Sequence, residues 1–311
     1  MTVNELNARY GAPGRIVFHE GFAGYPNVVI ANRFGTAEVA LLGGTVLSYR
    51  PTGQPEVLFG PAKKVGEYNR ADNIHRGIPV CWPQFGNRFS KDLPQHGFAR
   101  KMLFEVRGTE YSEEMTEVTL ALKSDTETKM LWNHDFDLEL KVSVSMKLNL
   151  KLTTKNTGTE PFDFNGGFHP YFLVRERDQT EVLGVDGCEF VDTRAPEKGK
   201  RTWVGSYPVR ETGSKIYEVS KYEYVLMDNA LNRAIAIVSR GNTRLVVWNP
   251  GDESAGRVAE FGVDGWRKFV CVEPCSTPDE AGHELKPGES HDLLMAVQSV
   301  PNDGSVHARH G

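Results

Sequence analysis

Two side chains of this sequence stand where they could exchange protons with a substrate, and the first is His169. It lies between Gly166-Gly167-Phe168 and Pro170-Tyr171-Phe172, a setting that limits solvent and restricts the orientation of an imidazole. Histidine titrates at about pH 6.5, so it can hold and release a proton at neutral pH. The alternative is a core histidine bonded to a backbone carbonyl, and His169 taken alone does not exclude it.

The second is Glu273. It follows the apolar run Phe269-Val270-Cys271-Val272, which predicts a buried strand, and it precedes Pro274, which we expect to end that strand. A carboxylate at the exit of a buried strand is poorly solvated, and desolvation raises its pKa and makes it a competent base. The alternative is a glutamate that only pairs with a nearby arginine.

Further polar groups lie in two loops rich in glycine, proline and aromatics, 76–86 and 93–100. Arg76 and Arg100 each offer a planar guanidinium that suits a phosphate. Gln95 and His96 could hydrogen-bond to sugar hydroxyls. Three aromatic side chains could stack on a sugar ring, although aromatics at such spacing also form cores: Trp82, Phe98 and Tyr171.

The elements that position these groups are predicted to be strands, because apolar residues recur with period two. The clearest run is 138–152, which is so long that we expect a bend or hairpin near Lys147 to Asn149. Further strands are predicted at 28–31, 38–42, 117–122, 234–238, 245–248 and 269–272. No segment longer than about ten residues has a helical period. Many short strands separated by Gly/Pro turns indicate an antiparallel sandwich or barrel.

Composition excludes several classes of function. The net charge is -5 and the 36 Lys and Arg are scattered, so we expect no nucleic-acid partner. No apolar stretch approaches the roughly 20 residues of a membrane span, and the N-terminus does not resemble a signal peptide, so we expect a cytoplasmic protein without a membrane partner. Four cysteines in 311 residues suggest reduced structural thiols. We find no repeat or linker and expect a single domain, 1–311, with a frayed tail at 301–311.

Taken together and in order, five segments resemble the glucose-6-phosphate 1-epimerase group of the aldose 1-epimerase family. They are Arg76-Gly-Ile-Pro with Pro83-Gln-Phe-Gly, Leu93-Pro-Gln-His-Gly-Phe-Ala-Arg100, His169-Pro-Tyr-Phe, Val247-Trp-Asn-Pro250 and Phe269-Val-Cys-Val-Glu273. The second of them is specific to the phosphosugar branch. Weaker likeness extends over nearly the whole chain.

This resemblance implies a fold, a reaction and a set of residue roles. The fold would be an all-β, galactose-mutarotase-like antiparallel β-sandwich (supersandwich), with no cofactor, no metal and a hexose 6-phosphate as substrate. His169 would be the general acid and Glu273 the general base. Arg76, Gln95, His96 and Arg100 would bind the substrate. We expect a monomer.

One position departs from the family pattern. Members carry an aspartate before an Arg-Ile/Val-Tyr segment, whereas this chain has Ser214-Lys215-Ile216-Tyr217. Either the correspondence is shifted or one substrate contact is missing. Two alternatives therefore stand beside a phosphosugar anomerase: a mutarotase of unphosphorylated aldoses, and a carbohydrate-binding or regulatory protein with reduced turnover. A glycoside hydrolase ranks last, because it needs two well-placed carboxylates and we find only Glu273.

Overall fold

Strands dominate the chain, as the period-two pattern predicts. The computed structural model describes residues 1–60, 69–70, 72, 75–87, 90–219, 221–252, 258–276 and 282–302. The described residues include the α-helices α1 (Val3–Tyr10) and α2 (Thr126–Leu131), and no helix among them is long and apolar enough to cross a membrane. Every strand pair in the described ranges is antiparallel, which confirms the predicted all-β class.

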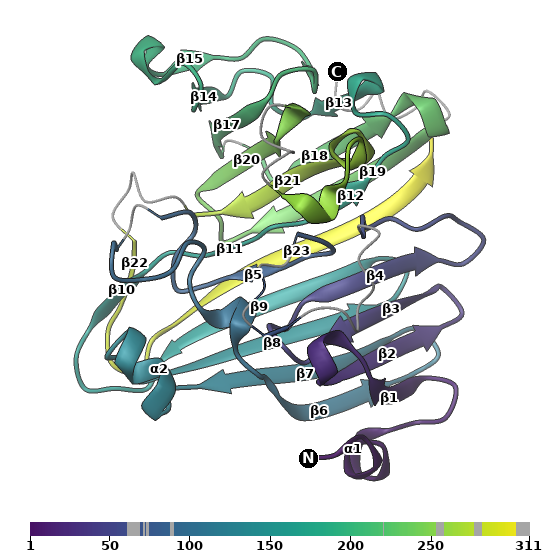
Figure 1. Ribbon diagram of the computed structural model, residues 1–311, viewed down its shortest axis with the longest axis vertical. Coiled ribbons are helices and arrows are strands. Elements are labelled where there is room, and N and C mark those ends of the chain that lie inside the picture. Colours follow the sequence, from purple (N-terminus) through teal and green to yellow (C-terminus); the bar gives the residue numbers. More distant parts are fainter. Residues whose placement is uncertain are drawn as a thin grey trace.

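The described strands form four sheets (Figure 1). The N-terminal sheet contains β1 (Ile16–Glu20), β2 (Pro26–Asn32), β3 (Gly35–Ala40) and β4 (Val46–Pro51). The largest sheet has the order β16 (Tyr207–Pro208), β13 (Thr180–Leu183), β18 (Glu223–Asp228), β19 (Arg233–Arg240), β23 (Ser290–Pro301), β9 (Leu148–Asn156), β8 (Phe136–Val144), β7 (Thr116–Lys123) and β6 (Glu105–Tyr111).

The third sheet carries the candidate site. Its order is β15 (Arg201–Thr202), β14 (Glu189–Asp192), β17 (Gly213–Glu218), β20 (Arg244–Asn249), β21 (Phe269–Cys275), β11 (Gly167–Phe168) and β5 (Val80–Cys81), and β12 (Tyr171–Leu173) also pairs with β21. A two-stranded sheet, β10 (Phe162–Phe164) with β22 (His283–Leu285), completes the set.

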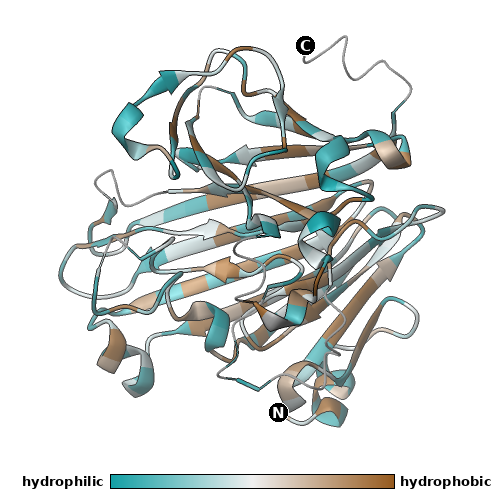
Figure 2. Cartoon of the chain, turned by 45° about the horizontal axis from the view of Figure 1, so that its top comes forward, coloured by the Kyte–Doolittle hydropathy of each residue, from teal (hydrophilic) through white to brown (hydrophobic). Residues whose placement is uncertain are grey.

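One continuous apolar core joins the three larger sheets. It includes Val39 of the N-terminal sheet, Leu150 of the largest sheet and Val272 of the third. The core forms because each strand buries one of its faces. In β8, for example, buried and half-buried residues alternate from Phe136 to Val142. Figure 2 shows the same pattern as alternating apolar and polar bands along the strands. The face of the third sheet that carries Val272 thus packs into the core, and its opposite face is left for the site.

The predicted strands all form, with small differences at their ends. The run 138–152 is a hairpin, but its turn lies at 145–147 between β8 and β9, slightly before the predicted position. The prediction that Pro274 ends its strand is wrong, because β21 continues to Cys275. Pro274 is tolerated there because β21 pairs with β12 up to Cys271 and with β11 again only at Cys275.

Two other predictions concern the cysteines and the tail. All four cysteines are free and buried: Cys81, Cys188, Cys271 and Cys275. Of the tail predicted to be frayed, Pro301 ends β23, and residues 303–311 lie outside the described residues.

Candidate active site

The register of the third sheet places His169 opposite Glu273. Gly167 pairs with Cys275, and Tyr171 pairs with Cys271 in the same register. His169 lies midway between Gly167 and Tyr171, and Glu273 lies midway between Cys271 and Cys275, so the two face each other. Directly opposed residues of an antiparallel pair project to the same face. The ladder is interrupted between these two pairs, where Pro170 and Pro274 have no N–H to donate. The backbone N–H of His169 donates to the Pro79 carbonyl on the other side. Two segments about one hundred residues apart in sequence thereby contribute one acid/base pair.

The imidazole and the carboxylate are in contact. His169 Nε2 lies 3.4 Å from Glu273 Oε2, and their side chains are 11% and 2% exposed. Apolar clusters lie on both sides of them along this face. One contains Phe59, Tyr171, Phe261, Phe269 and Cys271, and the other contains Cys81, Phe85, Val246 and Cys275. The pair therefore sits in a largely dehydrated environment.

Burial favours the uncharged form of both side chains. Desolvation raises the pKa of Glu273 well above its ordinary 4.5. The pKa of His169 falls well below 6.5, chiefly through desolvation and then through the charges of His96, Arg100 and His75. With one proton shared between them, the neutral pair is thus favoured over imidazolium and carboxylate.

His96 reaches the site because the loop that carries it passes very close to β5. A Cβ on Gly97 would lie 2.1 Å from the Trp82 carbonyl oxygen, and Gly97 has φ +70°, so only glycine fits there. The His96 ring centroid lies 5.2 Å from that of His169. His96 Nδ1 accepts a hydrogen bond from the Gly86 N–H, which leaves the ring proton on Nε2. Burial lowers the pKa of His96 to about 3, so this imidazole is a neutral donor.

The predicted substrate-binding residues occupy different depths. Arg100 is 7% exposed, and its Nη2 donates to the Gln95 carbonyl at 2.7 Å. Its charge lowers the pKa values of His96 and His169, so it lies near both. Gln95 itself is exposed. Arg76 is half-buried, and its guanidinium lies against Gly60. It stands two residues before Ile78, which forms a bridge with Val46 of β4. The structure thus brings His169, Glu273, His96 and Arg100 together, with Arg76 in the adjoining loop.

Two of the three aromatics proposed to stack on a sugar lie elsewhere. Trp82 is fully buried and donates from Nε1 to Thr154 Oγ1, and Phe98 packs edge-on against it in the main core. That prediction is wrong for both residues, because the break in alternation around them reflects a buried loop. Tyr171 does lie at the site, where its ring stacks on His169 with centroids 4.9 Å apart.

The sequence also left three neighbours of the pair without a role. The rings of Trp248 and Phe85 lie 5.7 Å and 6.1 Å from that of His169. Both stand in segments that carry the family resemblance, which was the available signal. His75, which pairs with Glu260, acts on His169 through its charge. Nothing in the local sequence of His75 indicates this role.

Ser214 lies on the same face as the acid/base pair. It is directly opposite Trp248, which is in turn opposite Cys271, two residues before Glu273 on β21. Residues that are opposed in this way share a face, so the serine does occupy a site-facing position. Its backbone N–H donates to Thr193 Oγ1 at 3.1 Å.

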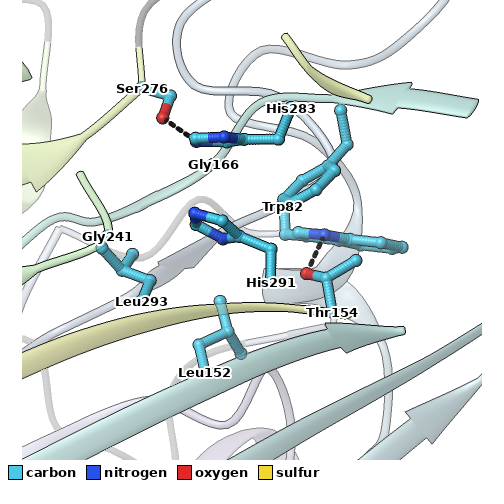
Figure 3. A pocket seen from close by; sticks show the side chains of 10 residues that line it. Trp82, Leu152, Thr154, Gly166, Gly241, Ser276, His283, His291 and Leu293 are labelled. Carbon is cyan, nitrogen blue, oxygen red and sulfur yellow. Dashed lines mark hydrogen bonds between the residues drawn. The ribbon is translucent and has the colours of Figure 1, made fainter. Parts of the chain in front are cut away.

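A second histidine pair lies beyond the end of β21, in the small pocket of Figure 3. The rings of His283 and His291 stack with centroids 3.8 Å apart, and His283 Nε2 is 2.7 Å from Ser276 Oγ. Leu152, Leu293 and Trp82 also line this pocket, whose volume of about 10 Å³ is room for about one water molecule. It is therefore too small for a sugar.

Similar solved structures identify the architecture. A "putative mutarotase" from Salmonella typhimurium matches with a TM-score of 0.84 and 24% identity, over 96% of this chain and 99% of that one. A "galactose mutarotase related enzyme" from Lactobacillus acidophilus matches with a TM-score of 0.71 and 17% identity, over 89% and 98%. The class is thus a galactose-mutarotase-like β-sandwich, as the resemblance implied.

Sequence comparison identifies the family. Residues 26–298 match the aldose 1-epimerase family, and the chain belongs to it. A protein of Cenchrus ciliaris named "Putative glucose-6-phosphate 1-epimerase" is 30% identical over 86% of this chain and 82% of its own. A protein of the same name from Escherichia coli (strain K12) is 31% identical over 76% and 78%. A sugar is therefore the implied class of substrate.

Proposed function

We propose that this protein is a cytoplasmic anomerase that interconverts the α and β forms of a hexose 6-phosphate, most simply glucose 6-phosphate. The observation that carries the proposal is the buried contact between His169 and Glu273. The names of the similar proteins support the phosphosugar as substrate. The segment that carries Gln95, His96 and Arg100 supports it independently, because it is typical of the phosphosugar branch.

The short distance suits the reaction. Anomer exchange moves one proton off the C1 hydroxyl and one onto the ring oxygen, and both oxygens are bonded to C1. A sugar lying over the pair, rather than between its members, would therefore meet an acid and a base 3.4 Å apart. We infer that Glu273 removes the hydroxyl proton while His169 protonates the ring oxygen, which opens the ring.

Ring opening and closing use the two proton arrangements of the pair. Opening starts from imidazolium and carboxylate and ends with neutral imidazole and carboxylic acid. The aldehyde then rotates about C1–C2, and closure from the other face returns both protons. Because burial favours the neutral arrangement, the site is suited to hold the open intermediate, and no cofactor is consumed.

The arginines would hold the substrate at the end remote from C1. Arg100 is nearly buried and close to His96, so its charge is little screened by solvent. Arg76 lies in the adjoining loop and would supply the second contact. A neutral His96, with its ring proton on Nε2, can donate to a sugar hydroxyl or to the ring oxygen.

The decisive experiment measures anomer exchange by NMR, with glucose 6-phosphate and with free glucose as substrates. We expect faster exchange of the phosphosugar, and we expect Arg100→Gln to raise KM for glucose 6-phosphate about tenfold or more while changing that for glucose little. Equal effects on the two sugars would remove phosphate binding from the proposal. No acceleration of either sugar would favour the carbohydrate-binding alternative, which the serine at position 214 supports.

A further inference from the structure

The acid/base pair has a third ligating group beside it, the thiol of Cys271. Among the described residues, the ligand atoms of His169, Cys271 and Glu273 form the one group of three or more that lie together, all within 4.8 Å of one another. All three residues are buried. Cys271 and Glu273 project from the same face of β21, and His169 faces them from the neighbouring segment.

The spacing of these atoms fits a tetrahedral metal ion. Two ligand atoms that each lie about 2.0–2.1 Å from one tetrahedral Zn²⁺ stand roughly 3.4 Å apart. His169 Nε2 and Glu273 Oε2 have this separation already, at 3.4 Å. Sulfur binds Zn²⁺ at about 2.3 Å, which sets it roughly 3.5 Å from the other two ligand atoms, so the Cys271 thiol would have to move toward them by at most about 1.3 Å.

The donor set selects for a particular class of ion. One thiolate, one imidazole and one carboxylate suit Zn²⁺ and the softer Cd²⁺, whereas Mg²⁺ and Ca²⁺ require more ligands and prefer oxygen. With three protein ligands, the fourth position stays open to water or to a sugar oxygen. Two protons leave for solvent when the ion binds, one from the Cys271 thiol and the one that His169 and Glu273 share.

We propose that His169, Cys271 and Glu273 bind one thiophilic divalent cation per chain, Zn²⁺ or Cd²⁺, and that this cation is a reversible inhibitor of the site rather than its cofactor. An ion held there occupies the imidazole nitrogen and the carboxylate oxygen, so neither can move a proton. Binding of the cation does not depend on the proposed function, whereas its inhibition of anomer exchange does.

The chain offers a matched control in Cys275. It lies on the same strand and the same face as Cys271, on the other side of Glu273, and is equally buried. It is absent from the group of nearby ligand atoms. Cys271→Ser should therefore remove a ligand, whereas Cys275→Ser makes the same chemical change outside the group.

The test titrates wild type, Cys271→Ser and Cys275→Ser with Cd²⁺ and follows the ultraviolet thiolate-to-cadmium charge-transfer band. Wild type and Cys275→Ser should bind one ion per chain, and Cys271→Ser should lose the band. In the exchange assay, the Zn²⁺ concentration for half inhibition should rise about 10- to 100-fold in Cys271→Ser alone. EDTA should restore the activity.

Two results would overturn the proposal: a band and an inhibition that persist in Cys271→Ser, or an equal loss in Cys275→Ser. Circular dichroism and thermal melting check the fold of each variant, and Cys271→Ala replaces the serine variant if that one does not fold. If wild type lacks anomerase activity but the band depends on Cys271 alone, the proposed function fails and the metal site stands.

Discussion

The molecule has two close pairs of histidines, in which His169 is buried and the other three are half-buried, and the pairs differ in what surrounds them. His169 and His96 meet edge to face beside a buried carboxylate and a buried guanidinium. His283 and His291 stack face to face, and the side-chain partner of the first is a serine hydroxyl. Burial lowers the pKa of all four imidazoles. A depressed histidine pKa alone therefore does not mark catalysis here.

What separates the pairs is a proton partner that shares the same desolvated space. Glu273 can accept the proton that His169 releases, so the pair can exchange protons with a substrate without a net change of charge. Ser276 offers no comparable acidity, and the pocket around His283 has no room for a sugar. The proposed chemistry therefore concerns the first pair, and we expect a structural role for the second.

The largest expected effect is on turnover, and it falls on one pair only. Glu273→Gln and His169→Asn should each reduce the exchange rate by about 10²- to 10⁴-fold, because each removes one proton-transfer group. His283→Gln is the matched control and should stay within a few fold of wild type. Polarimetry or exchange NMR on glucose 6-phosphate measures all three. Comparable losses in the control would erase the distinction between the pairs.

The second prediction concerns the pH profile of kcat/KM. The proposed mechanism requires one shared proton on His169 and Glu273. As pH falls, the second proton binds His169, whose pKa is below 6.5, so the acid limb should lie below pH 6.5. As pH rises, the proton leaves Glu273, whose pKa is well above 4.5. An acid limb at pH 6.5 or higher would contradict the dehydrated environment on which the mechanism depends.

The third prediction concerns the second histidine pair and its effect on the stability of the fold. Burial, and then the charge of His291, lower the pKa of His283 to about 4. The unfolded chain then binds more protons, so stability is complete above pH 6.5 and falls as pH drops from 6.5 toward 4. Allowing for its partial exposure, His283 accounts for about 1–2 kcal/mol of this loss.

Replacing His283 should flatten that dependence. We expect the free energy of unfolding of His283→Gln, measured by urea denaturation, to change less between pH 6.5 and pH 4 than that of wild type. His19→Gln is a suitable comparison, because the His19 side chain is 41% exposed and lies 3.3 Å from Glu38. Curves for His283→Gln and wild type that run parallel would show that the stacked pair does not couple stability to protons.

The sequence predicted the strands and singled out His169 and Glu273, but it did not predict the register that brings the two residues together. Period-two patterning identifies strands because one face of each must be buried, yet it does not say which strands are neighbours. The contact of His169 with Glu273 depends on that pairing. The family resemblance implied that both residues act on one substrate, but not that their side chains touch. The roles of Trp82 and Phe98 were predicted from a loop composition that also suits a core.

The second histidine pair was missed although a signal existed. His283 and His291 flank the turn at Pro287-Gly288-Glu289, and a chain reversal between two residues tends to bring them together. The stacking itself depends on β10 and on Ser276, which are distant in sequence. Local patterning holds no information about such contacts.

The smallest expected effect concerns Ser214, which departs from the family pattern. Ser214 shares the face of the acid/base pair, so a carboxylate in its place could accept a hydrogen bond from a sugar hydroxyl. One such bond contributes about 0.5–1.5 kcal/mol, so Ser214→Asp should lower KM about 2- to 10-fold. Ser214→Asn separates the effect of charge from that of size. An unchanged KM in Ser214→Asp would mean that the sugar does not reach β17, and that the substrate is held by the loops of His96 and Arg76 alone.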